Sequence, residues 1–374
     1  MAKKFLALLL ASLMMLTLGL TACGDSSTGS DTLEAIAKED LKIGFIYVGD
    51  AYDGGYSQAH EEGRLAMVEK LGLDEKTQTI VVENIPEDAS CAEAARNLID
   101  QGCNVIYANS FGHMQWIEQV ANEYPGVYFG HATGFTRTEN MTTYMGRIYE
   151  ARYLAGIVAG MQTKANKIGY VAAMPIAEVV RGINAFTLGV QSVNPEATVE
   201  VYWLNTWYDG TLEKSAALEL LNKGCDVMAQ HCDSPAPQIA AEEKGVFAIG
   251  YNLSTSTVAP KAYLTAPLFH WGEYYSANVQ SIIDGKWASE DFWQGLNSGV
   301  VSLDTLSDLC VDGVAEKVAA AEAAIKDGSL VIFSGEIYDN EGNLKVAAGQ
   351  AMTDAELTSF DWFVKGVIGS VPKS

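Results

Sequence analysis

Hydrophobic residues occur along the chain in short apolar runs, each followed by a polar turn and an amphipathic stretch. The unit at residues 41–72 shows this order: its first apolar run predicts a buried parallel strand, and a glycine-rich polar turn follows. Residues 58–71 then predict an amphipathic helix, and we expect its apolar face to carry Leu65, Val68 and Leu71. Ligands of open α/β sheets bind at the loop beyond the carboxyl end of a strand. The turn between these two elements is therefore the first candidate for a binding site.

The same alternation continues through most of the chain. Strands are expected at 42–48, 78–83, 104–108 and 127–130, and again at 167–172, 198–204, 226–229 and 246–250. Helices are expected between them at 58–71, 90–101 and 113–123, and again at 178–192, 212–223 and 236–244. Alternation of this kind predicts parallel sheets with helices on both faces, and right-handed crossovers bring every strand-to-helix loop to one edge.

The second set of elements repeats the first at a spacing of about 120 residues. Three segments recur in the same order: 43–46 as 168–171, 98–106 as 220–228, and 126–129 as 245–248. A period this long indicates a duplicated domain rather than a solenoid. The predicted fold class is therefore α/β, with two similar doubly wound parallel-sheet lobes joined by a hinge that the chain crosses several times.

Further apolar stretches indicate where the chain changes lobe. We expect an apolar helix at 149–163 to take the chain from the first lobe to the second, and a second crossing near 263–267. A helix at 274–284 then belongs to the first lobe, and a helix at 315–326 belongs to the second. We expect lobe 1 to contain 41–148 plus about 267–305, and lobe 2 to contain 149–266 plus about 306–374.

The N-terminal sequence predicts that the protein is located outside the cytoplasm. Residues 1–23 combine two lysines, an apolar run and a small-residue ending, the pattern of a secretory signal peptide. The apolar run, 5–20, is shorter than the roughly 20 residues that a membrane span needs. The ending resembles a bacterial lipobox, which implies cleavage before Cys23, a lipid on its thiol and attachment to the outer face of the cell membrane. Residues 24–40 are then a flexible tether.

Composition excludes several classes of protein. The chain has 24 Lys and Arg against 47 Asp and Glu, a net charge of −23, which argues against a nucleic-acid partner and is explained by solubility. Six cysteines are present, and if Cys23 is lipidated an odd number remains, so buried free thiols are favoured over disulfides. No Cys/His clusters have the spacing of a metal site, and neither metal nor cofactor is expected.

No motif for catalysis is apparent. The chain has no Gly-x-Ser-x-Gly, no Walker-type phosphate loop and no His-Glu-x-x-His. An enzyme such as a nucleoside hydrolase would need a nucleophile beside a base or a metal-binding aspartate cluster. A non-enzymatic function is therefore predicted.

Several motifs in one order resemble those of a known family. The two-lobed architecture resembles type I periplasmic binding proteins, and the motifs extend the resemblance to the basic membrane protein family of lipoproteins, the PnrA-like purine-binding components of ABC importers. They lie at 53–56, 145–150, 178–186, 230–237 and 361–366. The resemblance spans nearly all of 41–372 and implies a purine base or nucleoside as ligand and ABC permease subunits as partners. A ligand sensor for a membrane receptor would share the fold.

A planar ligand held between two lobes requires aromatic rings from both. The first half offers Tyr56 and Phe111, and the second offers Trp207 and Tyr208. The resemblance assigns Tyr56 and Trp207 to the two faces of the base. Packing within the lobes is the alternative role for each ring.

Polar side chains at the same strand ends are candidates to bind the edge of the ring. They are Ser57, Asn109, Ser110, Asp233 and Asn252. A carboxylate at Asp233 can accept hydrogen bonds from an exocyclic amine or a ring N–H, and Asn252 can donate and accept. Asp, Asn and Ser also favour helix N-caps, which is the alternative for these residues.

Two departures from the family bear on the ligand. Nucleoside-binding members carry an acidic residue where Asn252 lies and a lysine near 265–267, both associated with the sugar hydroxyls. In this chain the first position is an amide, Asn252, and residues 265–267 contain no lysine. A free purine base such as adenine, or a close analogue, is therefore favoured, with a nucleoside second, because Asp50, Asp53 or His270 could contact a ribose instead.

Overall fold

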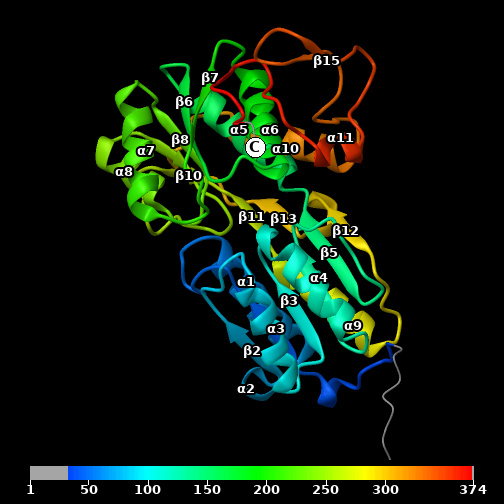
Figure 1. Cartoon of the computed structure of the whole chain (residues 1–374). Coiled ribbons are helices and arrows are strands. Elements are labelled where there is room, and N and C mark those ends of the chain that lie inside the picture. The colour runs from blue at the N-terminus through cyan, green and yellow to red at the C-terminus, as the bar shows by residue number, and fades with distance from the viewer. Residues whose placement is uncertain (1–32, 373–374) are drawn as a thin grey trace, which may run out of the picture.

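The computed structural model describes residues 33–372, which form two lobes, one above the other in Figure 1. The lower lobe is built on a six-stranded sheet of order β12-β5-β4-β3-β1-β2, in which all neighbours are parallel. Its strands are β1 (Ile43–Ile46), β2 (Thr79–Val82), β3 (Val105–Ala108), β4 (Tyr128–Ala132), β5 (Met141–Gly146) and β12 (Asp291–Gln294). Its helices are α1 (Tyr56–Leu71), α2 (Glu75–Gln78), α3 (Ser90–Asp100), α4 (Met114–Glu123) and α9 (Trp271–Ile283).

The upper lobe repeats this arrangement. Its sheet has the order β10-β9-β8-β6-β7-β16 and is also parallel throughout. The strands are β6 (Lys167–Ala172), β7 (Thr198–Trp203), β8 (Val227–His231), β9 (Phe247–Ile249), β10 (Tyr263–Thr265) and β16 (Val367–Ile368). The helices are α5 (Ile148–Gln162), α6 (Ala177–Val193), α7 (Gly210–Asn222), α8 (Ala236–Lys244), α10 (Val314–Lys326) and α11 (Asp354–Thr358).

The two sheets share one topology, which confirms the predicted fold class. Apart from the outermost strands β12 and β16, each sheet runs second-first-third-fourth-fifth in chain order. Left-handed backbone conformations also recur at equivalent strand ends, at Asn84 and Asn205 and at Thr133 and Asn252. In each lobe the strand order reverses between the first and third strands, β1 and β3 below and β6 and β8 above. Such a switch point opens a crevice beyond the strand ends.

The chain passes between the lobes three times. It rises from β5 into α5, descends from β10 into β11 (Pro267–Phe269), and rises again from β13 (Val301–Leu303) toward α10. Strands β11 and β13 pair antiparallel as a short ribbon between the lobes (Figure 1). In the upper lobe, β14 (Ile337–Tyr338) and β15 (Leu344–Val346) form a hairpin, with Gly342 at a φ of +91° in the turn between them.

Several strands were not predicted because their sequences do not show a simple alternation. Strand β5 contains Thr142 and Thr143, both fully buried. The Thr142 hydroxyl lies 2.8 Å from that of Tyr274, and the Thr143 hydroxyl donates to Asp291 at 2.8 Å. Strand β16 joins its sheet from the far end of the chain, so no local pattern indicates it.

The predicted apolar face of α1 was wrong at Leu65, whose side chain is exposed. The buried face carries His60, Arg64 and Met67 instead. This face packs closely on α9, where the His60 ring stacks on Trp271 with 4.4 Å between centroids. Arg64 is neutralised by an ion pair with Glu61 at 2.5 Å. Polar residues can occupy this face because each finds a partner there.

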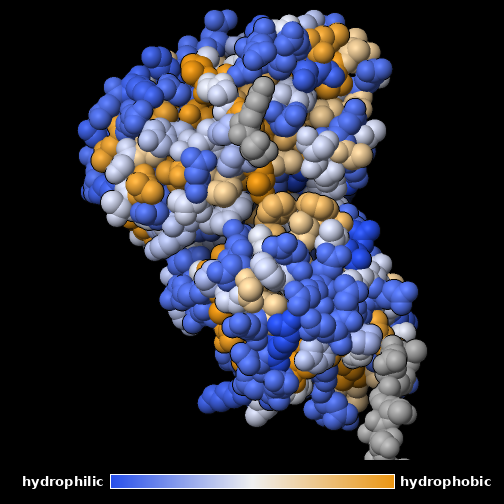
Figure 2. Space-filling view, viewed as in Figure 1, coloured by the Kyte–Doolittle hydropathy of each residue, from blue (hydrophilic) through white to orange (hydrophobic). Residues whose placement is uncertain are grey.

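The surface is mainly hydrophilic and the cysteines are mainly buried, as the amino-acid composition predicts. Hydrophilic residues cover most of the face shown in Figure 2. The five cysteines of the described part form no disulfide, and four of them are buried, as predicted: Cys91, Cys103, Cys225 and Cys232. Cys23 lies outside the described residues. Between residues 33 and 372 no helix is both long and apolar enough to cross a bilayer.

Because α1 and α9 are in close contact, a methyl group added at Gly63 should destabilise the protein. In Gly63→Ala the added Cβ would lie 2.5 Å from that of Trp271 and 2.9 Å from the Gly272 nitrogen, so the helices must separate. We expect the free energy of unfolding in urea to fall by about 1–3 kcal/mol, although alanine favours helices more than glycine does. Glu62→Ala, on the exposed side of α1, is the control and should stay within about 0.5 kcal/mol of wild type. A Gly63→Ala protein as stable as wild type would contradict this packing.

Candidate functional site

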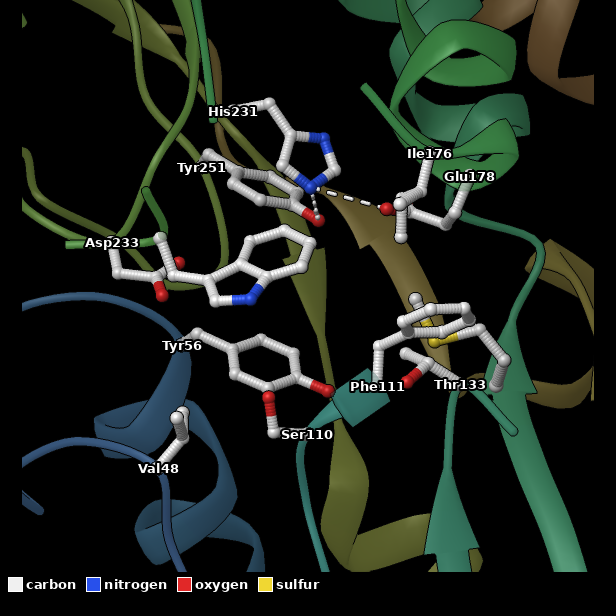
Figure 3. A pocket seen from close by; sticks show the side chains of 12 residues that line it. Val48, Tyr56, Ser110, Phe111, Thr133, Ile176, Glu178, His231, Asp233 and Tyr251 are labelled. Carbon is white, nitrogen blue, oxygen red and sulfur yellow. Dashed lines mark hydrogen bonds and ion pairs between the residues drawn. The ribbon is translucent and has the colours of Figure 1, made fainter. Parts of the chain in front are cut away.

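A pocket lies between the lobes, at the carboxyl ends of both sheets (Figure 3). Each lobe contributes six of its lining residues. The lower lobe provides Val48, Tyr56, Ser110, Phe111, Thr133 and Met145, and the upper lobe provides Ile176, Glu178, Trp207, His231, Asp233 and Tyr251. The loops of both switch points therefore meet in one site. A concave site lined mainly by apolar and aromatic side chains, with a few polar groups, is typical of small-molecule binding.

The lower wall of the pocket is the ring of Tyr56, the first residue of α1. Its hydroxyl donates to the carbonyl oxygen of Asn109 at 2.7 Å. Its ring meets His60 edge to face, with 4.6 Å between centroids, and His60 in turn stacks on Trp271. These contacts fix the position of the Tyr56 ring at the pocket.

The upper ring belongs to Trp207, from the loop between β7 and α7. Its Nε1–H donates to both carboxylate oxygens of Glu87 at 3.2 Å, and Glu87 belongs to the lower lobe, between β2 and α3. Glu87 is oriented by the Ser110 hydroxyl at 2.6 Å and the Gly112 N–H at 2.7 Å. The position of the upper ring thus depends on the lower lobe, and the bond exists only while the lobes are close.

The glycine-rich turn of the first unit touches the opposite lobe. A Cβ on Gly55 would overlap the carbonyl group of Asp233, and one on Gly54 would lie 3.1 Å from Pro235. Gly54 also has a φ of +79°, which other residues rarely adopt. The glycines of this turn therefore allow close contact between the lobes.

Asp233 brings an unpaired carboxylate to the pocket. Its side chain is buried, and none of residues 33–372 donates a hydrogen bond to it. Burial raises the pKa of this carboxyl well above its usual range, and the negative charges of Asp53, Glu213 and Glu178 raise it further. The alternative role as an N-cap is absent, because α8 begins after Pro235 without a side-chain cap. Because this carboxylate lines the pocket, a ligand bound there can supply the hydrogen-bond donor that the protein does not.

Three of the predicted ligand-binding residues do not line the pocket. Ser57 accepts a hydrogen bond from the Gly49 N–H at 3.2 Å, and the Asn109 side-chain oxygen accepts one from the Val48 N–H at 2.9 Å. Both shape the loops behind the wall. Asn252 is fully buried next to the lining residue Tyr251, and neither atom of its amide group has a partner within the described part of the chain. Direct contact of these residues with a ligand stays a prediction.

Sequence reasoning missed the upper polar wall, made of Glu178, His231 and Tyr251. The internal repeat could have indicated it. Helix α6 is the counterpart of α1. Glu178 is the second residue of α6 and therefore corresponds to Ser57, which follows Tyr56 in α1. His231 ends β8, the counterpart of β3, whose end was already a candidate.

Comparison with known proteins gives a consistent result. Residues 40–341 match the model of a family described as ABC transporter substrate-binding protein, PnrA-like. The chain is 37% identical over 339 residues to a purine-binding protein of Brucella abortus, covering 91% of this chain and 96% of that one. It is 39% identical over 334 residues to a Haloferax volcanii protein provisionally named as an ABC transporter glucose-binding protein, covering 89% and 82%. Among solved structures, an ABC transporter solute-binding protein of Aeropyrum pernix K1 matches in fold, with a TM-score of 0.68 at 18% identity over 78% of this chain and 92% of that one.

The raised pKa of Asp233 predicts that this residue destabilises the protein prepared without ligand. Because the folded pKa exceeds the unfolded value of about 4, stability is fully present below pH 4 and is lost as pH rises from there through the folded pKa. Asp233→Asn should therefore raise the melting temperature at pH 7, by about 2–4 °C if 1 kcal/mol is recovered. The difference should vanish near pH 3.

Asp100→Asn, at the exposed end of α3, is the matched control and should melt like wild type at both pH values. An Asp233→Asn protein that melts below wild type at pH 7 would show that the carboxylate stabilises the fold, contrary to this interpretation.

Proposed function

Because this chain belongs to the PnrA-like family of ABC transporter substrate-binding proteins, we propose that it captures a purine between its lobes and delivers it to a membrane permease. A free base such as adenine is the favoured ligand. The observation that carries the proposal is the pair of rings, Tyr56 from one lobe and Trp207 from the other, with the unpaired carboxylate of Asp233 beside them. Binding solutes for a transporter agrees with the absence of catalytic motifs in the sequence.

The two aromatic rings support a flat ligand. Both rings line the pocket, and a planar heterocycle placed between them would gain stacking contacts from both only when the lobes are closed. A ligand that bridges the lobes stabilises the closed arrangement, and a permease can then distinguish loaded protein from unloaded protein. Asp233 would accept a hydrogen bond from an amine or ring N–H at the edge of the base.

Charge supports a base more than a nucleoside. The lining residues include no lysine or arginine in the described part of the chain, so no cation is available for sugar hydroxyls. The Brucella relative is named as purine-binding. The Haloferax relative is named for glucose, so glucose belongs among the ligands tested.

We further propose that the protein is attached to the membrane by a lipid at its N-terminus. Cys23 would be lipidated after removal of 1–22 and would tether the protein to the outer face of the membrane, where the permease opens. Cys23 and residues 24–32 lie outside the described residues. The predicted tether was too long at its end, because Leu33 and Ile36 pack against the core and the Tyr128 hydroxyl donates to the Glu34 carbonyl oxygen at 3.0 Å. A membrane receptor read by the closed form is the alternative partner.

A thermal-shift screen of bases, nucleosides and sugars tests the ligand class. We expect adenine or a related base to raise the melting temperature most, because ligands that bind only the folded protein stabilise it. In calorimetry, Trp207→Ala should weaken binding of the best ligand by about 1–3 kcal/mol, the usual scale for a base stacked on an aromatic ring.

Tyr208→Ala is the matched control, since this neighbouring ring is exposed and does not line the pocket. It should bind like wild type. Stabilisation by glucose or another sugar with no response to purines would overturn the proposed ligand.

A further inference from the structure

The pocket contains a second carboxylate with a free oxygen. Glu178 lines the upper wall, and its Oε2 lies 3.1 Å from His231 Nε2. Its other oxygen, Oε1, is buried and has no hydrogen-bond partner within residues 33–372. This oxygen can only accept hydrogen bonds while the group is ionised. A ligand that satisfies it must therefore carry a donor at that place.

A chain of hydrogen bonds fixes the charge and orientation of Glu178. Arg152 Nη2 lies 3.2 Å from His231 Nδ1, and because arginine can only donate, Nδ1 must be the acceptor. A neutral His231 then carries its hydrogen on Nε2 and donates it to Glu178. Arg152 is itself held by the Gln230 carbonyl oxygen at 2.6 Å and stacks over the Tyr251 ring at 3.7 Å.

The surroundings keep these two groups in the required forms. Burial lowers the pKa of His231, and the positive charge of Arg152 lowers it further, against the effect of Glu178. Burial alone would raise the pKa of Glu178, but His231, Arg181 and Arg152 outweigh it, and this pKa lies below its usual value. At neutral pH the wall therefore presents an anionic acceptor.

The two carboxylates line the same pocket as the Trp207 ring. In Figure 3 Asp233 lies at one side of the pocket and Glu178, close to His231, lies at the other. A flat ligand stacked on this ring would have one edge toward each carboxylate. The edge at Glu178 must then offer a hydrogen-bond donor, and the edge at Asp233 can offer one to the ionised carboxylate.

We propose that Glu178 accepts the N9–H of a free purine base and thereby excludes nucleosides, in which N9 carries the sugar. The inference rests on the proposed function, since it assumes that a purine occupies the pocket. Adenine offers a donor at both edges, its exocyclic amine and its N9–H. A nucleoside offers the first but lacks the second, which leaves Oε1 buried without a partner. Sites built around a ligand's N–H or O–H reject analogues lacking that group strongly.

Two adenine analogues isolate this hydrogen bond. 7-Deazaadenine keeps the N9–H, and 4-aminofuro[2,3-d]pyrimidine has the same shape with an oxygen in its place. We expect calorimetry to show that wild-type protein binds the first more tightly by on the order of 10²-fold or more. Equal affinity for the two, in a protein that binds adenine, would overturn the role of Glu178 while leaving the proposed function intact. Failure of adenine and of every other purine base and nucleoside in the screen to bind would overturn the proposed function itself.

The variant Glu178→Gln tests the residue directly. His231 Nε2–H should hold the new amide by its oxygen, so that the NH2 group faces the ligand and donates. The preference should then shrink or reverse in favour of the furan analogue, an effect that mere loss of structure cannot produce. A variant that folds by circular dichroism and keeps the wild-type ratio would contradict the proposal. If the variant does not fold, the analogue pair on wild-type protein still decides.

Discussion

The contact between the lobes at the pocket mouth determines how the rest of the site is built. Trp207 reaches across to Glu87, and the turn at Gly54 and Gly55 lies against Asp233 and Pro235. Neither lobe alone has a complete site, because each supplies one ring and half of the lining. Ligand binding and lobe closure are for this reason two aspects of one equilibrium.

A column of aromatic rings connects the hinge ribbon to the lower wall. Phe269, in β11, stacks on Trp271 at 4.4 Å, Trp271 stacks on His60 at the same distance, and His60 meets the edge of Tyr56. The glycine contact between α1 and α9 makes this close packing possible. The lower ring is thus fixed relative to the hinge, while the upper ring is fixed by its bond to Glu87. We therefore expect Tyr56 to keep its position in the open protein, and Trp207 to reach the pocket only when the upper lobe closes.

The sequence predicts the architecture better than the chemistry of the site. The repeat and the alternating elements are recoverable because apolar runs are local signals. The pattern alone offered four candidate rings, and the family resemblance selected Tyr56 and Trp207 among them. The buried polar face of α1 is not recoverable, since Leu65 was placed inward by periodicity while the partners of His60 come from α9, more than 200 residues away. Glu178 was missed for a related reason: its free oxygen is apparent only when the position of His231 is known. Ser57 and Asn109 show the converse, because residue type and position suggested ligand contacts where the side chains bind loop backbone.

We infer that a planar base lies between Tyr56 and Trp207 with its edges toward two carboxylates. A crystal structure of the protein with adenine would show the ligand and its contacts. We expect the base to be stacked between the two rings, with one edge at Asp233, the other at Glu178 and the bond from Trp207 to Glu87 retained. Adenine bound outside this pocket, or bound within it without contact to both rings, would contradict this arrangement.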